Sequence, residues 1–254
     1  MKKFLLTQLR SARRLYKVLE TAYLNVANSE NPVMKKLVLT QRLFRLRRTP
    51  NLVFIHIPKT AGSSVRRELS DVLGMQNLLN ISSHFPNMGA VTPVHRFWSE
   101  LLDQGIVSKS FHNNSYKFAI MRNPYDRFSS LFFYLKQLGK TDSKNELEFL
   151  LELEKERESL EYGHRLFIAR PQTDWILDCE GNVFVDEIFF LEQLGVLADS
   201  LGERFGRSIV FPPVNTSHRF DTFLSSKERR TLLQKINSFY AKDFEIGRYE
   251  MNYL

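Results

Sequence analysis

The sequence predicts an α/β protein of three layers, in which a mainly parallel central sheet has helices on both faces. Two observations support this fold class. The apolar runs at residues 52–57 and 117–121 are each followed by a polar turn and then by a segment with helical spacing of apolar residues. Repeated strand–turn–helix units are typical of parallel sheets. A chain of 254 residues can bury one sizeable core. We therefore expect one main domain at residues 51–254 and a basic, helical N-terminal extension at residues 1–50.

The positive charge of the chain is confined to that extension. The formal net charge is +8, but residues 1–50 hold 12 Lys and Arg against two Glu, which gives +10. The remaining residues hold 24 Lys and Arg against 26 Asp and Glu, which gives −2. A domain this close to neutrality is not expected to bind nucleic acid over a broad basic face. The single cysteine, Cys179, excludes an internal disulfide and a Cys-rich zinc site, and no metal site is predicted.

The extension itself is expected to form two helical pieces, broken near residues 28–32. Its first piece has apolar residues on one face and Arg10, Arg13, Arg14 and Lys17 on the other. Such a helix can lie on an anionic membrane surface, bind a partner, or pack on the domain with its basic side in solvent. No stretch approaches the length of about 20 apolar residues that spans a bilayer. We expect a cytoplasmic protein with peripheral membrane contact through residues 1–48, although the Arg-rich composition also fits a transit peptide.

The first motif, HIPKTAGSS at residues 56–64, predicts a phosphate-binding turn. Pro58 ends the strand because it has no N–H, and the helix that follows has Val65 and Leu69 on its core face. Free amides at this helix start, one cation and several small residues could hold a phosphate; these residues are Lys59, Thr60, Gly62, Ser63 and Ser64. No glycine precedes Lys59, so the motif is not a Walker A loop. Alternatively, these residues form an ordinary solvated helix cap.

The second motif, RNPYDRFSS at residues 122–130, predicts a second anion site. Asn123 and Pro124 are suited to the N-cap and first position of a helix that ends near Leu138. Arg122 follows a strand, where open α/β sheets bind ligands, and Ser130 lies in the second helical turn. An arginine fork with a serine hydroxyl suits a terminal phosphate dianion. The alternatives are a structural ion pair for Arg122 and an ordinary helix position for Ser130.

The two motifs resemble the 5′-phosphosulfate-binding and 3′-phosphate-binding motifs of sulfotransferases that use 3′-phosphoadenosine 5′-phosphosulfate (PAPS). Their amino-acid sequences are most similar to the motifs of the group that contains Golgi carbohydrate sulfotransferases and their bacterial relatives. The resemblance covers residues 51–250, and its weaker segments are RPQTDW at 170–175, VDEIFFLE at 185–192, NTS at 215–217 and DFE at 243–245. It implies a P-loop-like form of the three-layer fold. It also implies PAPS as co-substrate, no metal, and a carbohydrate or glycoconjugate as acceptor.

The resemblance further implies a role for each motif residue. Lys59 would contact the 5′-phosphosulfate and stabilise charge on the departing phosphate. Thr60, Gly62, Ser63 and Ser64 would bind the same end of the co-substrate, and Arg122 and Ser130 would hold its 3′-phosphate. Two other functions stay open, namely a kinase-like phosphotransferase and a catalytically inactive relative that binds a nucleotide or a glycan.

The acceptor hydroxyl needs a general base, and histidine suits this role near neutral pH. His95 is the first candidate, because relatives often place a histidine some way before the second motif and His95 precedes Arg122 by 27 residues. His84 in an expected loop is the second candidate. His56 belongs to the first motif, but a strand position fits a buried structural histidine at least as well. Glu68 and Asp126 are alternatives that also suit ordinary helix positions.

Three later segments are expected to be mainly structural. Residues 141–161 are rich in Glu and predict a solvated helix that could cover the acceptor cleft. Gln172, Trp175 and Asn215 could contact the acceptor or the nucleotide, although a polar residue near a buried Trp is more often its structural partner. Ser225 and Glu228 have the spacing of a capping box at the start of the last long helix.

Overall fold

The computed structural model describes residues 52–73, 79–80, 96–103, 105, 107–161, 163–211 and 224–252. Its strands are β1 (Leu52–Ile55), β2 (Leu79–Asn80), β3 (Tyr116–Met121) and β4 (Glu187–Phe190). Its helices are α3 (Gly62–Leu73), α5 (Trp98–Asp103), α6 (Lys109–Asn113), α7 (Pro124–Gln137), α8 (Glu146–Lys155), α9 (Leu194–Phe205), α10 (Ser226–Phe239) and α11 (Ala241–Gly247). Short 3-10 turns lie at Arg157–Ser159, Phe167–Ala169, Gln172–Trp175 and Leu191–Gln193.

The four strands form one parallel sheet in the order β2-β1-β3-β4. The chain first moves from β1 to β2 on one side and then returns to place β3 on the other side of β1. β1 and β3 are neighbours in which Phe54 pairs with Phe118, and the two rings stack with centroids 5.0 Å apart. Because β2 and β3 lie on opposite sides of β1, the direction of strand addition reverses between β1 and β3. In open α/β sheets the crevice at such a reversal, outside the carboxyl ends of the strands, is where ligands bind.

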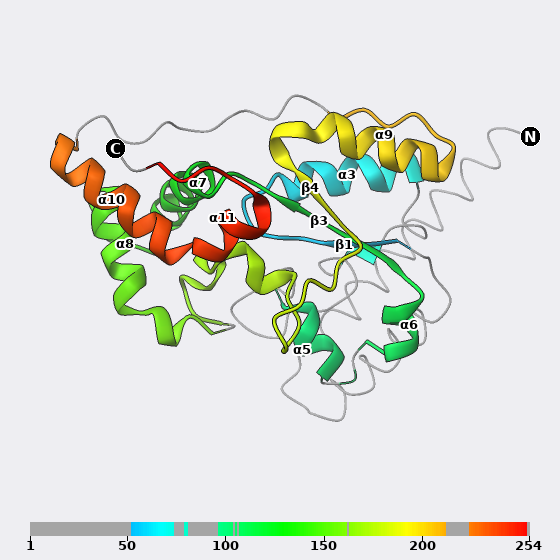
Figure 1. Cartoon of the computed structure of the whole chain (residues 1–254), viewed down its shortest axis with the longest axis horizontal. Coiled ribbons are helices and arrows are strands. Elements are labelled where there is room, and N and C mark those ends of the chain that lie inside the picture. The colour runs from blue at the N-terminus through cyan, green and yellow to red at the C-terminus, as the bar shows by residue number, and fades with distance from the viewer. Residues whose placement is uncertain are drawn as a thin grey trace, which may run out of the picture.

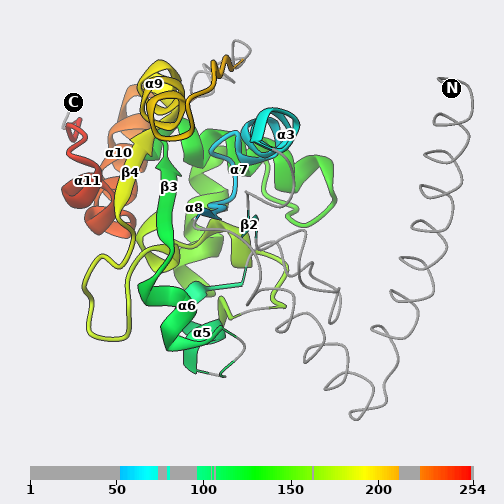
Figure 2. The same ribbon diagram turned by 90° about the vertical axis from the view of Figure 1, so that its right-hand side faces the viewer.

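Alternate side chains of β1 and β3 enter two separate cores, as the period of two in a strand requires. Leu52 and Phe54 pack against α3 and α9, whereas Val53 and Ile55 pack on the opposite face with Trp98 of α5. Figures 1 and 2 show α3 and α9 together on one side of the sheet and α5 and α6 on the other. The predicted fold class, a three-layer α/β arrangement with a parallel sheet and helices on both faces, is confirmed.

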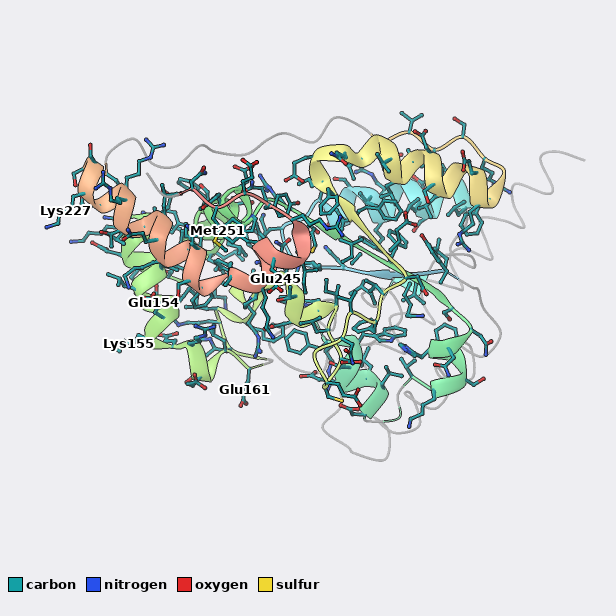
Figure 3. The ribbon with its side chains drawn as sticks, in the orientation of Figure 1. Glu154, Lys155, Glu161, Lys227, Glu245 and Met251 are labelled. Atoms are coloured by element: carbon teal, nitrogen blue, oxygen red, sulfur yellow. The ribbon has the colours of Figure 1, made fainter. Side chains whose placement is uncertain are left out.

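A third core lies beyond the carboxyl ends of β1 and β3, where α7, α8, α10 and α11 pack together (Figure 1). Figure 3 places Glu154 on α8 and Lys227 at the outer end of α10. The Glu154 carboxylate accepts a hydrogen bond from Lys235 of α10 at 2.7 Å, which joins the two helices at the surface. This helical layer carries α7, and so it fixes where the second motif lies relative to the sheet.

The ends of α7 follow the sequence prediction closely. The Asn123 side chain caps the helix by accepting from the Tyr125 amide, Pro124 occupies the first turn, and Gly139 follows the helix with a φ of 63°. The Ser225–Glu228 capping box at α10 is also confirmed.

The prediction for residues 141–161 was only partly right. The helix there is α8, and one of its faces is buried rather than solvated. Phe149, Leu150 and Leu153 enter the core with α7 and α10, and Glu146 is fully buried. The regular spacing of these apolar residues outweighs the high content of Glu.

Several sequence predictions fall on residues outside the described ranges. These are the N-terminal helical extension at residues 1–50, the candidate bases His84 and His95, and Asn215. Within the described ranges, none of the helices has the length and apolar character needed to cross a bilayer.

Candidate functional site

The two motifs meet at the reversal point of the sheet. The turn after β1 contains Lys59, and Arg122 directly follows β3, the neighbouring strand. The Arg122 guanidinium donates through Nη1 to the Lys59 carbonyl at 3.4 Å, across 63 residues of sequence. The predicted phosphate-binding turn and the start of the predicted second anion site are therefore in direct contact, and together they form one candidate site.

The backbone of the first turn adopts an unusual conformation. Lys59 and Ala61 have φ values of 68° and 59°, in the left-handed region that non-glycine residues rarely occupy. Thr60 is fully buried, and its hydroxyl donates to the Ile57 carbonyl at 2.9 Å. Such strain, of about 1–3 kcal/mol for each residue, is found mainly where a functional geometry requires it. The Thr60 hydroxyl, predicted among the phosphate-binding groups, is instead engaged within the turn, where its hydrogen bond supports the strained shape.

Helix α3 begins directly after this turn and presents its first amides at the site. The first N–H groups of a helix have no partner within the helix, and they favour a negative charge. Ser63 is exposed, Ser64 is half-buried, and the first turn of α3 contains no acidic residue. The start of α3 thus combines amide and hydroxyl donors without a competing carboxylate.

Gly62 is required at this helix start for a reason that the motif alone did not predict. A Cβ added to Gly62 would lie 2.0 Å from Cδ2 of the His56 ring. His56 is buried, with 7% of its surface exposed, and its ring stacks on Phe54. His56 therefore supports α3 from beneath, which favours the structural alternative for this histidine.

The Lys59 ammonium lies near the surface against an aromatic ring. Its Nζ is 4.1 Å from the centroid of Tyr134, whose side chain is 38% exposed. Burial lowers the pKa of Lys59, and the positive charge of Arg122 lowers it further. No carboxylate among the described residues acts to raise this pKa. An anionic ligand would supply the missing opposite charge.

Arg122 is buried, with 6% of its surface exposed, and its backbone is tightly held. The Gln172 side chain accepts from the Arg122 amide and donates to its carbonyl, both at 2.9 Å. Burial lowers the pKa of Arg122, while the negative charges of Asp126 and Glu192 oppose that change. Gln172, expected to be either a ligand contact or a structural partner, thus fixes the residue that begins the second motif.

The neighbouring serines of α7 differ in their surroundings. Ser129 donates to the buried Glu146 carboxylate at 2.7 Å and so joins α7 to α8. Ser130 lies one residue further along the second motif and is 7% exposed. Tyr134, the ring beside Lys59, follows Ser130 by four residues and so lies on the same face of α7. That spacing was visible in the sequence, but Tyr134 was not predicted as a site residue.

The candidate site combines a strained turn that contains a lysine, a helix start that offers amide and hydroxyl donors, and a buried arginine directly after the neighbouring strand. Such groups at the carboxyl ends of parallel strands are typical of α/β proteins that bind ligands with phosphate-like groups. The chain matches the Sulfotransferase family over residues 42–250, a range that includes both motifs and α11. The chain therefore belongs to the sulfotransferase family. No curated protein and no solved structure matches it significantly.

Proposed function

We propose that this protein transfers a sulfuryl group from PAPS to a hydroxyl of a carbohydrate or glycoconjugate. Membership of the sulfotransferase family supports sulfuryl transfer as the reaction class. The observation that supports PAPS most directly is the contact between the Arg122 guanidinium and the Lys59 carbonyl. This contact brings two cationic residues, Lys59 and Arg122, together in one site. A ligand with two anionic groups requires two such positive charges. The carbohydrate acceptor rests on the resemblance of the motifs.

In this proposal the two motifs bind opposite ends of the co-substrate. Lys59, with the free amides at the start of α3 and the hydroxyls of Ser63 and Ser64, holds the 5′-phosphosulfate. The Thr60 hydroxyl takes no part, because it donates to the Ile57 carbonyl within the turn. Arg122 and Ser130 hold the 3′-phosphate, for which the guanidinium supplies a paired set of donors. Gln172 keeps Arg122 in place through its two backbone contacts.

The proposed transfer is direct and in line. The acceptor oxygen forms a bond to sulfur while the bond from sulfur to the 5′-phosphate oxygen breaks. Lys59 and the amides of α3 stabilise the negative charge that develops on the departing phosphate, so these residues perform the main electrostatic task. His95 is the proposed base that removes the acceptor proton. The mechanism requires no metal, which stays a prediction.

The proposal is tested first by nucleotide binding. We expect 3′-phosphoadenosine 5′-phosphate to bind more tightly than adenosine 5′-phosphate in isothermal titration calorimetry. Arg122→Ala should remove most of this difference, by about 1.5–3 kcal/mol for a lost charged hydrogen bond. Equal affinity of the wild type and Arg122→Ala for the bisphosphate would remove the 3′-phosphate assignment. Tight binding of ATP that requires Mg²⁺, without binding of the bisphosphate, would instead support a phosphotransferase.

The acceptor is identified by a transfer assay with radiolabelled PAPS and a panel of oligosaccharides and phenols. Transfer to oligosaccharides that Lys59→Ala abolishes would support the proposed activity. Nucleotide binding without transfer to any acceptor class would support the alternative of an inactive relative.

A further inference from the structure

Arg127 is a buried cation to which the proposed reaction gives no role. Its side chain lies in the second motif, on α7, and is only 1% exposed. The guanidinium donates to three backbone carbonyls, those of Pro58 at 3.0 Å, Arg170 at 3.0 Å and Ile168 at 2.9 Å. A charge in such a place is costly unless its donors are satisfied, so all three contacts matter to the fold. These contacts connect α7 to two distant loops.

One of those loops contains Lys59. The Pro58 carbonyl belongs to the residue directly before Lys59, in the turn with the positive φ values. The other two carbonyls belong to the segment that leads into the 3-10 turn Gln172–Trp175. Arg127 therefore fastens the first motif to residues 168–170 at a fixed distance.

Asp243 performs the corresponding task for the second motif. It lies on α11 near the end of the chain and is fully buried. Its carboxylate accepts from the Gln172 amide at 2.8 Å and from the Thr173 amide at 3.0 Å. Gln172, held in this way, pairs with both backbone groups of Arg122. A continuous series of hydrogen bonds therefore runs from α11 to the start of the second motif.

The two buried charges also act on each other through space. The negative charges of Asp243 and Asp174 oppose the effect of burial on the pKa of Arg127. Burial raises the pKa of Asp243, and the Arg127 charge and the two amides oppose that rise. Arg127 holds residues 168 and 170 of the short segment 168–173, and Asp243 holds residues 172 and 173. One end of that segment is fastened to the Lys59 turn and the other end to Arg122.

We propose that Arg127 and Asp243 are positioning residues that set the separation between Lys59 and Arg122 through the segment 168–173. The importance of this separation for binding rests on the proposed function, because one ligand spans both positions there. A rigid spacing favours such a ligand, since displacement of a binding group by about 1 Å can cost about a hundredfold in rate. The positioning role itself concerns the free protein and has its own test.

The first variant is Arg127→Lys, which keeps the charge but loses the fork that reaches three carbonyls. The readout is the pKa of Lys59, measured by NMR on protein with ¹³C-methylated lysines and assigned with Lys59→Arg. We expect this pKa to rise towards its ordinary value, because a loosened turn is less buried and further from Arg122. On unmethylated protein, calorimetry should show a loss of affinity for 3′-phosphoadenosine 5′-phosphate of about tenfold or more.

The matched control is Leu153→Ala, a core substitution on α8 away from the site. It should lower the unfolding midpoint but leave the pKa of Lys59 and the nucleotide affinity unchanged. If Arg127→Lys also lowers only the midpoint, Arg127 is merely structural and the proposal is overturned.

Asp243→Asn tests the end of the segment that holds Arg122. It also tests the positioning proposal by itself if Arg127→Lys does not fold. It should weaken binding of the bisphosphate and spare binding of adenosine 5′-phosphate, which has no 3′-phosphate. Equal losses for both nucleotides would overturn the role of Asp243. A wild-type protein that fails to bind the bisphosphate would contradict the proposed function, whereas the Lys59 pKa in Arg127→Lys would still decide the positioning role.

Discussion

Lys59 is held beside a second cation, and this gives the site a defined pH dependence. Burial and Arg122 lower the pKa of Lys59 below its ordinary 10.5. Between the two values the unfolded chain binds a proton that the folded protein does not, so this group makes stability rise with pH in that window. The sign is opposite for anion binding. An anion prefers the protonated ammonium, so its affinity should fall as pH rises through the lowered pKa.

We therefore expect the affinity for 3′-phosphoadenosine 5′-phosphate to decline at alkaline pH, before an ordinary lysine would lose its proton. Calorimetry across this range measures the decline. Lys59→Arg provides the matched control, because a guanidinium stays charged up to a pH of about 12. Its affinity should remain level over the same range. Parallel pH profiles for the wild type and Lys59→Arg would show that another group is responsible.

Gly62 provides a second prediction at this scale. Gly62→Ala should destabilise the protein by about 1–3 kcal/mol, because the new methyl group meets the buried His56 ring. Gly195→Ala is the control, since a Cβ there meets nothing within 4 Å, and alanine in helix α9 is neutral or stabilising by up to about 1 kcal/mol. Urea unfolding measures both. If His56→Ala does not relieve the effect of Gly62→Ala in the double variant, the clash is not its cause.

The residues of the first motif show how far a sequence pattern can be interpreted. The pattern predicted Lys59 and a helix start at the carboxyl end of a strand, and the structure has both there. It assigned Gly62 to the group of small residues that could hold a phosphate, whereas the structure gives a packing reason, the His56 ring beneath it. A motif specifies which residue is needed, but the neighbour that makes it necessary becomes visible only when strand and helix are packed together.

Helix α7 is the element that joins the site to the core. Its N-cap, its first-turn proline and its end near Leu138 follow from local backbone chemistry, and they were predicted correctly. The role of Arg127 on the same helix could not be predicted in this way. Its three partners are backbone carbonyls 41, 43 and 69 residues away, and any residue type supplies a carbonyl. Only the tertiary structure identifies them.

The adjacent serines of α7 allow a test that separates stability from binding. Ser129→Ala should lower the free energy of unfolding by about 1–3 kcal/mol, because the buried Glu146 carboxylate loses a donor. It should leave nucleotide affinity nearly unchanged. Ser130→Ala should reduce the affinity for 3′-phosphoadenosine 5′-phosphate and cause a smaller loss of stability. Urea unfolding and calorimetry on both variants measure these effects, and the reverse pattern would exchange the roles assigned to the two serines.

At the scale of the whole molecule, the site is assembled from segments that are distant in sequence. Residues that directly follow β1 and β3, residues of the turn at 172–175 and Asp243 of α11 converge on it, so the chain from β1 to α11 contributes. The family match to residue 250 includes this last helix. The parallel sheet explains the convergence of the two motifs, because the carboxyl ends of parallel strands lie at one edge. The contribution of α11 was not expected beyond a weak sequence resemblance at residues 243–245.

The distribution of charge leads to the last prediction, which concerns residues 1–48. The extension has a net charge of +10 and the rest of the chain −2, so attraction to an anionic surface should depend on the extension alone. Near an anionic membrane each Lys or Arg contributes about 1 kcal/mol, and salt screens this attraction. We expect the full chain to sediment with phosphatidylserine vesicles and not with phosphatidylcholine vesicles, and high salt to release it.

Deletion of residues 1–30 should reduce binding strongly. A full-length variant in which Arg10, Arg13, Arg14 and Lys17 are changed to Gln keeps the chain length and should bind less in proportion to the lost charge. Vesicle binding unchanged in both variants would show that this segment has another role, such as packing on the domain.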